Sequence, residues 1–435
     1  MRILAWPLLI WMTACSGGTS VPAPQPAPAR EPVETTFEVM PWTLPVTAVA
    51  AQPDLVAAPG GDALLSWIEP SGEGGHALKF ARFDGRHWQA PREIARGGDW
   101  FVNWADTPHI VATEDGALWA HWLRKSASAT YAYDVVLSRS GDGGATWAPP
   151  RRVNDDGTPT EHGFVSLWPQ ARDRIGVAWL DGRATASDPA QGAHAAHGGG
   201  AMALRTAVFD AALGKTEEAQ LDARTCDCCQ TGAALTARGP LLVYRDRDDA
   251  EIRDIASTRL RDGTWTAPRT VHDDRWTMPA CPVNGPSVDA RGDDAWVAWY
   301  TAAGDVPTLR MARSTTSGDT FSPPVDVDRG DAVQGRASLV VHAESVWVSW
   351  IRETGEGQGV WVARYSLDLS RELQRIEVAR LQGRGRATGF PQMASSSHGV
   401  LMAWTDVVDG KPLLRGALLA ASGSTSAAAG ATAAR

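Results

Sequence analysis

The sequence predicts an all-β protein, a β-propeller of four-stranded antiparallel blades, and two observations carry this prediction. First, a short apolar run ends in an aromatic ring about every fifty-five residues, at Trp67, Trp122, Trp179, Tyr244, Trp299, Trp350 and Trp404. Second, turns rich in Gly and Asp separate further β-branched runs inside each repeat. Such a unit cannot bury its apolar face alone, so neighbouring units must stack. We expect seven blades, with six as the alternative if weak outer repeats merge.

Each repeat divides into four predicted strands. The first is a short strand after a loop, such as 54–58, and the second is the run that ends in the ring. The third is typified by 134–138, and a turn with Asp, Gly and an aromatic residue precedes the fourth. The seventh repeat stops after its third strand, so we expect 36–39 to supply the fourth. That closure would remove a free sheet edge.

The N-terminus has the features of an export signal. Arg2 precedes an apolar stretch, 3–12, that is too short to span a bilayer, and Met-Thr-Ala-Cys15 follows. Small residues before a cysteine resemble the bacterial lipobox, in which that cysteine is lipidated; an ordinary cleaved signal is the alternative. Ser16, in place of Asp, favours the outer membrane, on its periplasmic or surface side. We predict a lipoprotein signal peptide over 1–14, a Pro/Ala-rich tether over 15–34, the propeller over 35–420 and a disordered tail over 421–435.

Composition limits the partners. The 435 residues carry a net charge of −9 without a block of Lys and Arg, which argues against a nucleic-acid partner. The expected partners are the membrane, through the lipid anchor, and a glycan or another envelope component. We expect a monomer.

One turn carries a family resemblance. The segment from Ser140 through Asp142 and Gly144 to Trp147 reads S-G-D-G-G-A-T-W. Asp142 can accept backbone N–H bonds inside the turn, and the glycines permit positive φ. The segment resembles the Asp box, or BNR repeat, S-x-D-x-G-x-T-W, of sialidases and related propellers. The resemblance implies that these residues are structural and lie away from the active face.

Loops at the opposite end of the blades are dense in charge. Chain direction places the loops after each second strand and before each first strand at this end. A charged rim around the mouth of the central tunnel is the functional interpretation, and solvation of strand ends is the alternative. Five residues of these loops are candidate binding residues: Arg183, Asp181, Asp246, His162 and Asn284.

The resemblance to sialidases implies particular roles at this end. Sialidases hold the substrate carboxylate with three arginines, which implies the cluster Arg245, Arg253 and Arg336. They also use a Tyr activated by a Glu, with an Asp as acid and base. These roles imply Tyr300 as nucleophile with Glu251 or Glu161 beside it, and Asp106 as acid/base. The family's Arg-Ile-Pro motif is absent near the N-terminus.

Four cysteines besides Cys15 lie in two loops that enter neighbouring first strands. They are Cys226, Cys228, Cys229 and Cys281. Two disulfides, with three possible pairings, are one interpretation in an oxidising compartment. The other is a thiolate metal site, for which Cu(I) or zinc is suitable. No other cofactor is predicted.

Two functional classes follow from the sequence. One is a glycoside hydrolase of sialidase type that acts on an anionic glycan at the Arg/Asp/Glu-lined face. The other is a non-catalytic propeller lipoprotein that binds a glycan, a metal or an envelope protein through the same face.

Overall fold

The computed structural model describes residues 35–46, 49–59, 63–186, 200–355 and 357–422 of the 435-residue chain. The predicted signal peptide, Cys15 and the tether lie outside the described residues, as does all but the start of the predicted tail. Export and lipidation therefore stay predictions of the sequence. In the described part of the chain, no helix has the length and apolar character needed to cross a membrane.

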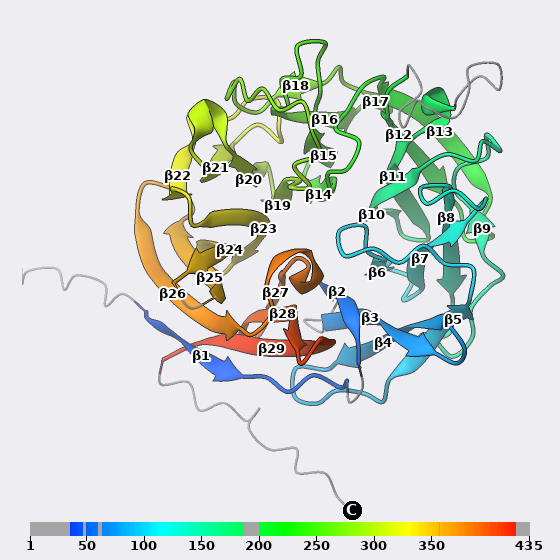
Figure 1. Ribbon diagram of the computed structural model, residues 1–435, viewed down its shortest axis with the longest axis horizontal. Helices are drawn as coiled ribbons and strands as arrows, with labels where there is room; N and C mark the ends of the chain where they lie inside the picture. Colours follow the sequence, from blue (N-terminus) through cyan, green and yellow to red (C-terminus); the bar gives the residue numbers. More distant parts are fainter. Residues whose placement is uncertain (1–34, 47–48, 60–62, 187–199, 356, 423–435) are drawn as a thin grey trace, which may run out of the picture. The chain divides into compact units, whose positions relative to one another are not determined.

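The described residues after Thr35 form seven antiparallel sheets set around a common centre (Figure 1). This arrangement confirms the seven-bladed propeller and rules out six blades. Each blade starts near the centre, and its later strands lie progressively farther out (Figure 1). Loops that enter first strands therefore meet near the central axis.

The strands of the first four blades are as follows. Blade 1 contains β2 (Ala51–Ala57), β3 (Ala63–Ser71), β4 (Gly75–Phe83) and β5 (Arg92–Gly97). Blade 2 contains β6 (Ile110–Ala112), β7 (Leu118–Lys125), β8 (Tyr133–Ser140) and β9 (Arg151–Arg152). Blade 3 contains β10 (His162–Ala171), β11 (Arg174–Asp181), β12 (Ala203–Phe209) and β13 (Lys215–Asp222), with the short helix η1 (Arg183–Thr185) after β11. Blade 4 contains β14 (Gly232–Thr236), β15 (Gly239–Arg245), β16 (Ile255–Arg261), β17 (Thr264–Trp265) and β18 (Arg269–Thr270).

The last three blades complete the ring. Blade 5 contains β19 (Ser287–Arg291), β20 (Asp294–Thr301), β21 (Thr308–Ser314) and β22 (Val325–Arg329), with η3 (Ala303–Asp305) after β20. Blade 6 contains β23 (Val333–His342), β24 (Ser345–Thr354), β25 (Gly357–Ser366) and β26 (Glu372–Leu381). Blade 7 contains β27 (Gln392–Ser396), β28 (Gly399–Val408), β29 (Lys411–Ala421) and β1 (Phe37–Pro41), with η4 (Gly385–Thr388) before β27.

The N-terminal strand closes the ring, as the sequence predicted. β1 pairs antiparallel with β29 in the register Phe37 to Ala421 through Pro41 to Ala417 (Figure 1). The Phe37 ring packs edge-on against Trp347, with 4.8 Å between ring centroids, and Gln374 bonds both backbone groups of Phe37. β1 therefore connects blade 7 to blade 6 as well as completing its own sheet.

We expect Phe37→Ala to lower the free energy of unfolding by about 2 kcal/mol, because a partly buried phenyl ring is removed. Urea unfolding followed by tryptophan fluorescence measures this change. Glu38→Ala, on the same strand, removes an exposed side chain and serves as the control. A loss in the control equal to that of Phe37→Ala would contradict the role of the ring.

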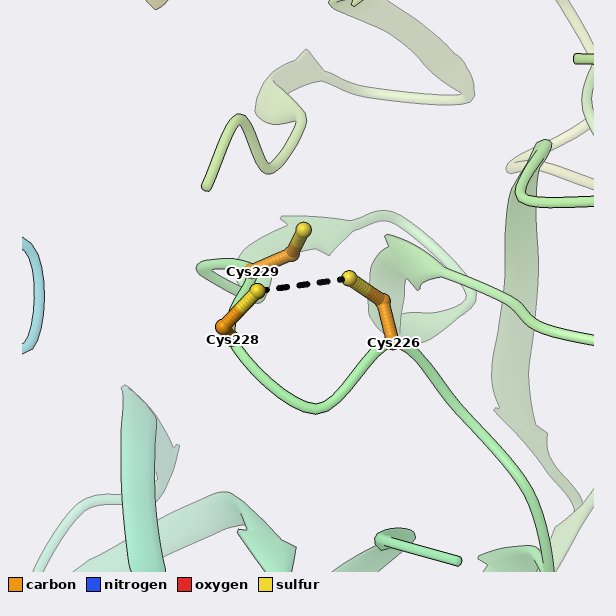
Figure 2. A group of neighbouring side chains, drawn as sticks. All are labelled: Cys226, Cys228 and Cys229. Carbon is orange, nitrogen blue, oxygen red and sulfur yellow. Dashed lines mark hydrogen bonds between the residues drawn. The ribbon is translucent and has the colours of Figure 1, made fainter. Parts of the chain in front are cut away.

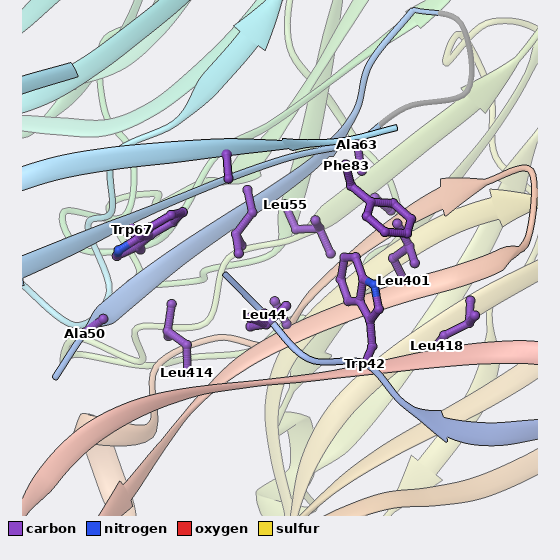
Figure 3. Close-up of a cluster of buried hydrophobic side chains, with 14 of the residues drawn as sticks. Trp42, Leu44, Ala50, Leu55, Ala63, Trp67, Phe83, Leu401, Leu414 and Leu418 are labelled. Atoms are coloured by element: carbon purple, nitrogen blue, oxygen red, sulfur yellow. The ribbon is translucent and has the colours of Figure 1, made fainter. Parts of the chain in front are cut away.

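Apolar clusters between neighbouring blades form the core. Between blades 7 and 1, Trp42 packs edge-on against Phe83 at 5.2 Å, near Leu401 and Leu418 (Figure 3). Second strands are apolar along most of their length because both of their faces are covered by other blades. The core thus holds the blades side by side and leaves their loops to form the two faces.

Five of the aromatic rings near the ends of the second strands share a polar contact that sequence patterns did not reveal. In five blades the ring donates its N–H or O–H to a carboxylate, at 2.5 to 2.8 Å. The pairs are Trp67–Glu69, Trp179–Asp181, Tyr244–Asp222, Trp299–Asp274 and Trp350–Asp328. Part of the predicted charged rim therefore satisfies buried aromatic donors.

The turn between β8 and β9 has the hydrogen bonds expected from its sequence. Asp142 accepts the backbone N–H groups of Ala145 and Thr146, and also the hydroxyls of Thr146 and Ser140. A Cβ at Gly144, where φ is +88°, would lie 2.2 Å from the Phe80 ring, so the position requires glycine. Trp147 meets the same ring edge-on at 6.0 Å.

Candidate functional site

Three cysteine sulfurs converge in the connection between β13 and β14. The Sγ atoms of Cys226, Cys228 and Cys229 all lie within 4.8 Å of one another (Figure 2). The Cys226 and Cys228 sulfurs are 4.0 Å apart, far beyond the roughly 2.05 Å of a disulfide. All four described cysteines are free thiols, so the structure contains none of the predicted disulfides among them. We call Cys226, Cys228, Cys229 and Cys281 the cysteine cluster.

Backbone contacts fix the position of the connection. The amide of Cys226 donates to the carbonyl of Arg245 in blade 4, and Gln230 donates to the carbonyl of Ala105. The Gln230 side chain also accepts the amide of Gly285, where a Cβ would lie 2.1 Å from the Gln230 carbonyl oxygen. The two loops that carry the cysteine cluster are therefore packed directly on each other.

Cys281 comes from the connection between β18 and β19 and is exposed. Its thiol hydrogen-bonds with that of Cys228, and this contact lowers the pKa of Cys281. The contact brings together the two cysteine loops, as the sequence predicted for loops entering neighbouring first strands. Cys281 lies outside the group whose three sulfurs are mutually within 4.8 Å.

A chain of charges surrounds Cys226. The Arg253 Nη1 donates to the Cys226 sulfur at 3.3 Å, and its Nη2 donates to Glu251 at 2.9 Å. Arg247 donates to both oxygens of Glu251 and, at 2.9 Å, to Asp227. Burial raises the pKa of a thiol, yet contacts with Cys228 and Cys229 and the charge of Arg245 lower the pKa of Cys226 well below its usual range.

Glu251 is engaged by arginines. The hydrogen bonds from Arg247 and Arg253 lower the pKa of its carboxyl, which keeps it ionised. Glu251 bonds Arg247 and Arg253, and the Tyr300 hydroxyl has no hydrogen bond to a carboxylate among the described residues. Tyr300 instead packs edge-on against Trp276 at 5.6 Å. No hydrogen bond therefore joins the predicted nucleophile to Glu251, and the roles of the two residues stay predictions of the sequence.

A second group of titratable residues lies where blades 2 and 3 meet. The Tyr133 hydroxyl lies 2.7 Å from Glu161 Oε1 and 3.2 Å from Asp106 Oδ2. Asp106 also accepts the amide of Phe164 at 2.8 Å, and a Cβ at Gly163 would lie 1.9 Å from its Oδ2. The single hydroxyl proton cannot serve both carboxylates, so a retained carboxyl proton completes the pair of contacts. We call Asp106, Tyr133 and Glu161 the carboxyl–tyrosine trio.

The trio holds its protons tightly. Burial raises the pKa of Asp106 to about 7, against hydrogen bonds from Phe164 and Tyr133. Burial also raises the pKa of Glu161 to about 8, and the charges of Asp106, Asp227 and Cys281 act in the same direction. The pKa of the Tyr133 hydroxyl is raised well above its ordinary value, first by burial and then by its two acids. The trio and the cysteine cluster are therefore electrostatic neighbours.

Two of the predicted anion-binding arginines bind backbone carbonyls instead. The Arg245 guanidinium donates to the carbonyls of Asn284, Arg253 and Tyr300 and lies 4.8 Å from the centre of the Trp276 ring. Arg245 is only 1% exposed. These contacts leave none of its groups directed at solvent.

Arg336, like Arg245, bonds backbone carbonyls and lies over a tryptophan ring. It donates to the Thr388 hydroxyl and to the carbonyls of Gly385 and Gly389, and it lies over the Trp104 ring. Burial lowers the pKa of Arg336 to about 10. The Asn284 side chain accepts the amide of Arg336, so this residue also holds loops together.

A third group contains Asp156, His162 and Asp181, whose ligand atoms lie within 4.8 Å of one another. Arg183 already forms two bonds with Asp181, at 2.7 and 2.8 Å, and its Nη2 lies 3.5 Å from Asp156. A cation placed in this group would be repelled by that guanidinium. Burial lowers the pKa of His162, but Asp156 and Asp181 outweigh it and raise the pKa.

The remaining predicted rim residue, Asp246, is half-buried, and its side chain accepts the amide of Arg247. Burial, followed by the charge of Asp222, raises the pKa of Asp246 to about 6. Sequence reasoning missed Tyr133, Asp227 and Arg247 as members of the site. Asp227 stands between the cysteines of one motif, which is a signal that could have identified it.

Neither a protein-family model nor a curated protein matches the chain. Solved structures resemble it at low sequence identity. The phage phi92 endosialidase is 10% identical with a TM-score of 0.50, and the match covers 92% of this chain and 72% of that one. A protein of unknown function from Dyadobacter fermentans DSM 18053 is 14% identical with a TM-score of 0.45, covering 89% and 98%. The NanB sialidase from Streptococcus pneumoniae is 11% identical with a TM-score of 0.43, covering 88% and 71%. At these identities the likeness shows the fold alone.

Proposed function

We propose that this protein binds Cu(I) through the thiolates of Cys226, Cys228 and Cys229. The observation that carries the proposal is the convergence of three unbonded sulfurs within 4.8 Å. Thiolates are soft ligands, which select Cu(I) and zinc over hard cations. The donor set therefore fits a soft metal ion.

The sulfur spacing also fits a metal centre. Ligands bonded to one ion at about 2.3 Å lie about 3.8 to 4.0 Å from each other. The Cys226 and Cys228 sulfurs are 4.0 Å apart. Structural zinc sites take four ligands, and the fourth cysteine lies outside the mutually close group. Three sulfurs without a fourth favour Cu(I) over zinc.

The surroundings support a negatively charged centre. Three thiolates and one Cu(I) carry a net charge of −2. The Arg253 N–H contact to the Cys226 sulfur and the nearby charge of Arg245 offset part of this charge. Glu251 orients Arg253 by accepting its second N–H. Such contacts outside the ligand set orient ligands and tune affinity.

The test is anaerobic titration of the reduced full-length chain with Cu(I), in competition with bathocuproine disulfonate. We expect one Cu(I) per chain in the wild type. Cys226→Ser should weaken Cu(I) binding by at least about a hundredfold, because it removes one of the three ligands. X-ray absorption of the loaded protein should show sulfur neighbours at roughly 2.3 Å.

Two results would contradict the proposal. One is the absence of Cu(I) binding in the reduced wild type. The other is unchanged affinity in Cys226→Ser. Ser257→Ala in blade 4, which removes a buried hydroxyl that bonds the carbonyl of Arg269, is the control for general perturbation and should leave affinity unchanged. Zinc bound more tightly than copper would reassign the metal.

The carboxyl–tyrosine trio favours a second candidate function, acid–base action on an anionic glycan. Carboxyl groups that keep protons near neutral pH can act as general acids. The buried Tyr133 stacks on Phe101 at 4.0 Å, and Tyr131, 59% exposed, meets the same ring. The exposed ring of Tyr131 offers a surface for a sugar ring.

Hydrolysis of 4-methylumbelliferyl glycosides of N-acetylneuraminic acid and glucuronic acid tests this second function. Glu161→Gln should reduce turnover by about a hundredfold or more. Glu217→Gln, exposed on β13, is the matched control and should retain full activity. Absence of turnover by the wild type would remove the glycosidase hypothesis and leave the metal site untouched.

A further inference from the structure

The four cysteines of the cysteine cluster differ in their exposure to solvent, from fully buried to exposed. Cys226 and Cys229 are 0% and 1% exposed, Cys228 is partly buried, and Cys281 is exposed. A metal bound only by the first two could not be reached from outside. An approaching molecule would meet the Cys281 sulfur first.

Cys281 is also the member that comes from the other loop. It contacts Cys228 and not the whole group, so Cys228 stands between the surface thiol and the buried pair. Hydrogen bonds hold the loop that carries Cys281 at the residues that follow this cysteine. Arg245 bonds the carbonyl of Asn284, and Gln230 bonds the amide of Gly285. The cluster thus consists of a fixed inner set and an outer thiol on an anchored loop.

From this arrangement we infer that Cys281 is the exchange ligand through which Cu(I) enters the site, and that the donor is a molecule presenting Cu(I) on thiolate sulfur. The inference rests on the proposed Cu(I)-binding function and adds how the ion arrives. Soft sulfur ligands compete for Cu(I) where hard ligands do not, so a sulfur donor can meet a sulfur acceptor directly.

The transfer balances as a ligand exchange. The Cys281 thiol loses its proton to solvent and forms a Cu–S bond, while one Cu–S bond to the donor breaks and the freed donor thiolate takes up a proton. Cys228, and then the buried Cys226 and Cys229, each lose the thiol proton to solvent as they bond the ion. The remaining donor bonds and the Cys281 bond break in the same exchange, and the released thiolates take up protons from solvent. The ion stays Cu(I) throughout, and no oxidant or reductant takes part.

The test compares the loading rate with the equilibrium affinity of the full-length chain under anaerobic, reduced conditions. The probe is the Cu(I)–glutathione complex, mixed rapidly with wild type, Cys281→Ser or Cys281→Met. We expect Cys281→Ser to bind Cu(I) at equilibrium nearly as well as the wild type but to load about tenfold more slowly. Methionine, a soft thioether ligand, should restore most of the rate.

Three results would overturn the inference. Cys281→Ser could load at the wild-type rate, or it could lose as much equilibrium affinity as Cys226→Ser, which would make Cys281 a permanent ligand. Slow loading that Cys281→Met does not rescue would indicate a structural role. Failure of the wild type to bind Cu(I) at equilibrium is a separate result and refutes the proposed function itself. Far-UV circular dichroism checks that each variant is folded.

Discussion

Arg245→Met is expected to lower the free energy of unfolding by about 3 to 5 kcal/mol, because three buried carbonyl groups lose their donor. The guanidinium bonds the carbonyls of Asn284, Arg253 and Tyr300 in a region where Arg245 is 1% exposed. Methionine fills much of the volume and removes the cost of a buried charge, but it offers no N–H. Each unsatisfied carbonyl costs about 1 to 3 kcal/mol, which exceeds the gain from one apolar side chain.

Urea unfolding of the metal-free, reduced protein measures this loss. Arg224→Met is the matched control, because Arg224 pairs with Asp249 where both side chains are largely exposed, at 44% and 94%. Removing such a pair changes stability by roughly 0 to 1 kcal/mol. If Arg245→Met were as stable as the control, the carbonyl contacts would not be what holds Arg245, and a role in anion binding would regain support.

The fold could be predicted from the sequence because its determinants are local and repeated. The seven rings, from Trp67 to Trp404, lie in the buried second strands, each within the last five residues of its strand, and their spacing favoured seven blades. The missing fourth strand of the last repeat pointed to the chain's other end, where Phe37 pairs with Ala421. Both arguments need only periodicity and the requirement that sheet edges be covered.

The candidate site could be predicted in location but only partly in chemistry. The positions of the two loops before neighbouring first strands correctly predicted that Cys281 lies near the other three cysteines. These positions could not show that Arg245 and Arg336 bind backbone carbonyls, since most of those carbonyls belong to the next blade along the chain. Tyr133 was missed because nothing in its own segment marks it. Its importance comes from Glu161, 28 residues away, and from Asp106.

The aromatic–carboxylate pairs explain why charge density alone misleads at this face. Asp181 was predicted to bind a ligand, yet it accepts the Trp179 N–H and two bonds from Arg183. In all five pairs the carboxylate is already used by a buried aromatic donor, whether or not the two residues share a strand. Groups without such an internal use are better candidates for function, and the thiols of the cysteine cluster meet that criterion.

The pH dependence of stability should identify Glu161 as a buried acid that keeps its proton in the folded state. Burial, with the charges of Asp106, Asp227 and Cys281, raises its pKa from 4.5 to about 8. Because the folded pKa is higher than the unfolded one, the stabilising contribution is complete below pH 4.5 and is lost as pH rises through about 8. A difference of this size corresponds to roughly 4 to 5 kcal/mol.

Glutamine is neutral at every pH. Between pH 5 and pH 9 the free energy of unfolding of Glu161→Gln should therefore fall by about 4 kcal/mol less than that of the wild type. Asp106, with a pKa raised to about 7, gives a slope of the same sign and remains in both proteins, so the difference between them reports Glu161 together with its charge coupling to Asp106. Urea unfolding of the metal-free, reduced protein at both pH values measures it, and Glu217→Gln on the exposed face of β13 should follow the wild type. Parallel curves for Glu161→Gln and the wild type would mean that Glu161 is ionised in the folded protein. In that case the shared proton of the trio, and with it the general-acid role in the second candidate function, would have to be abandoned.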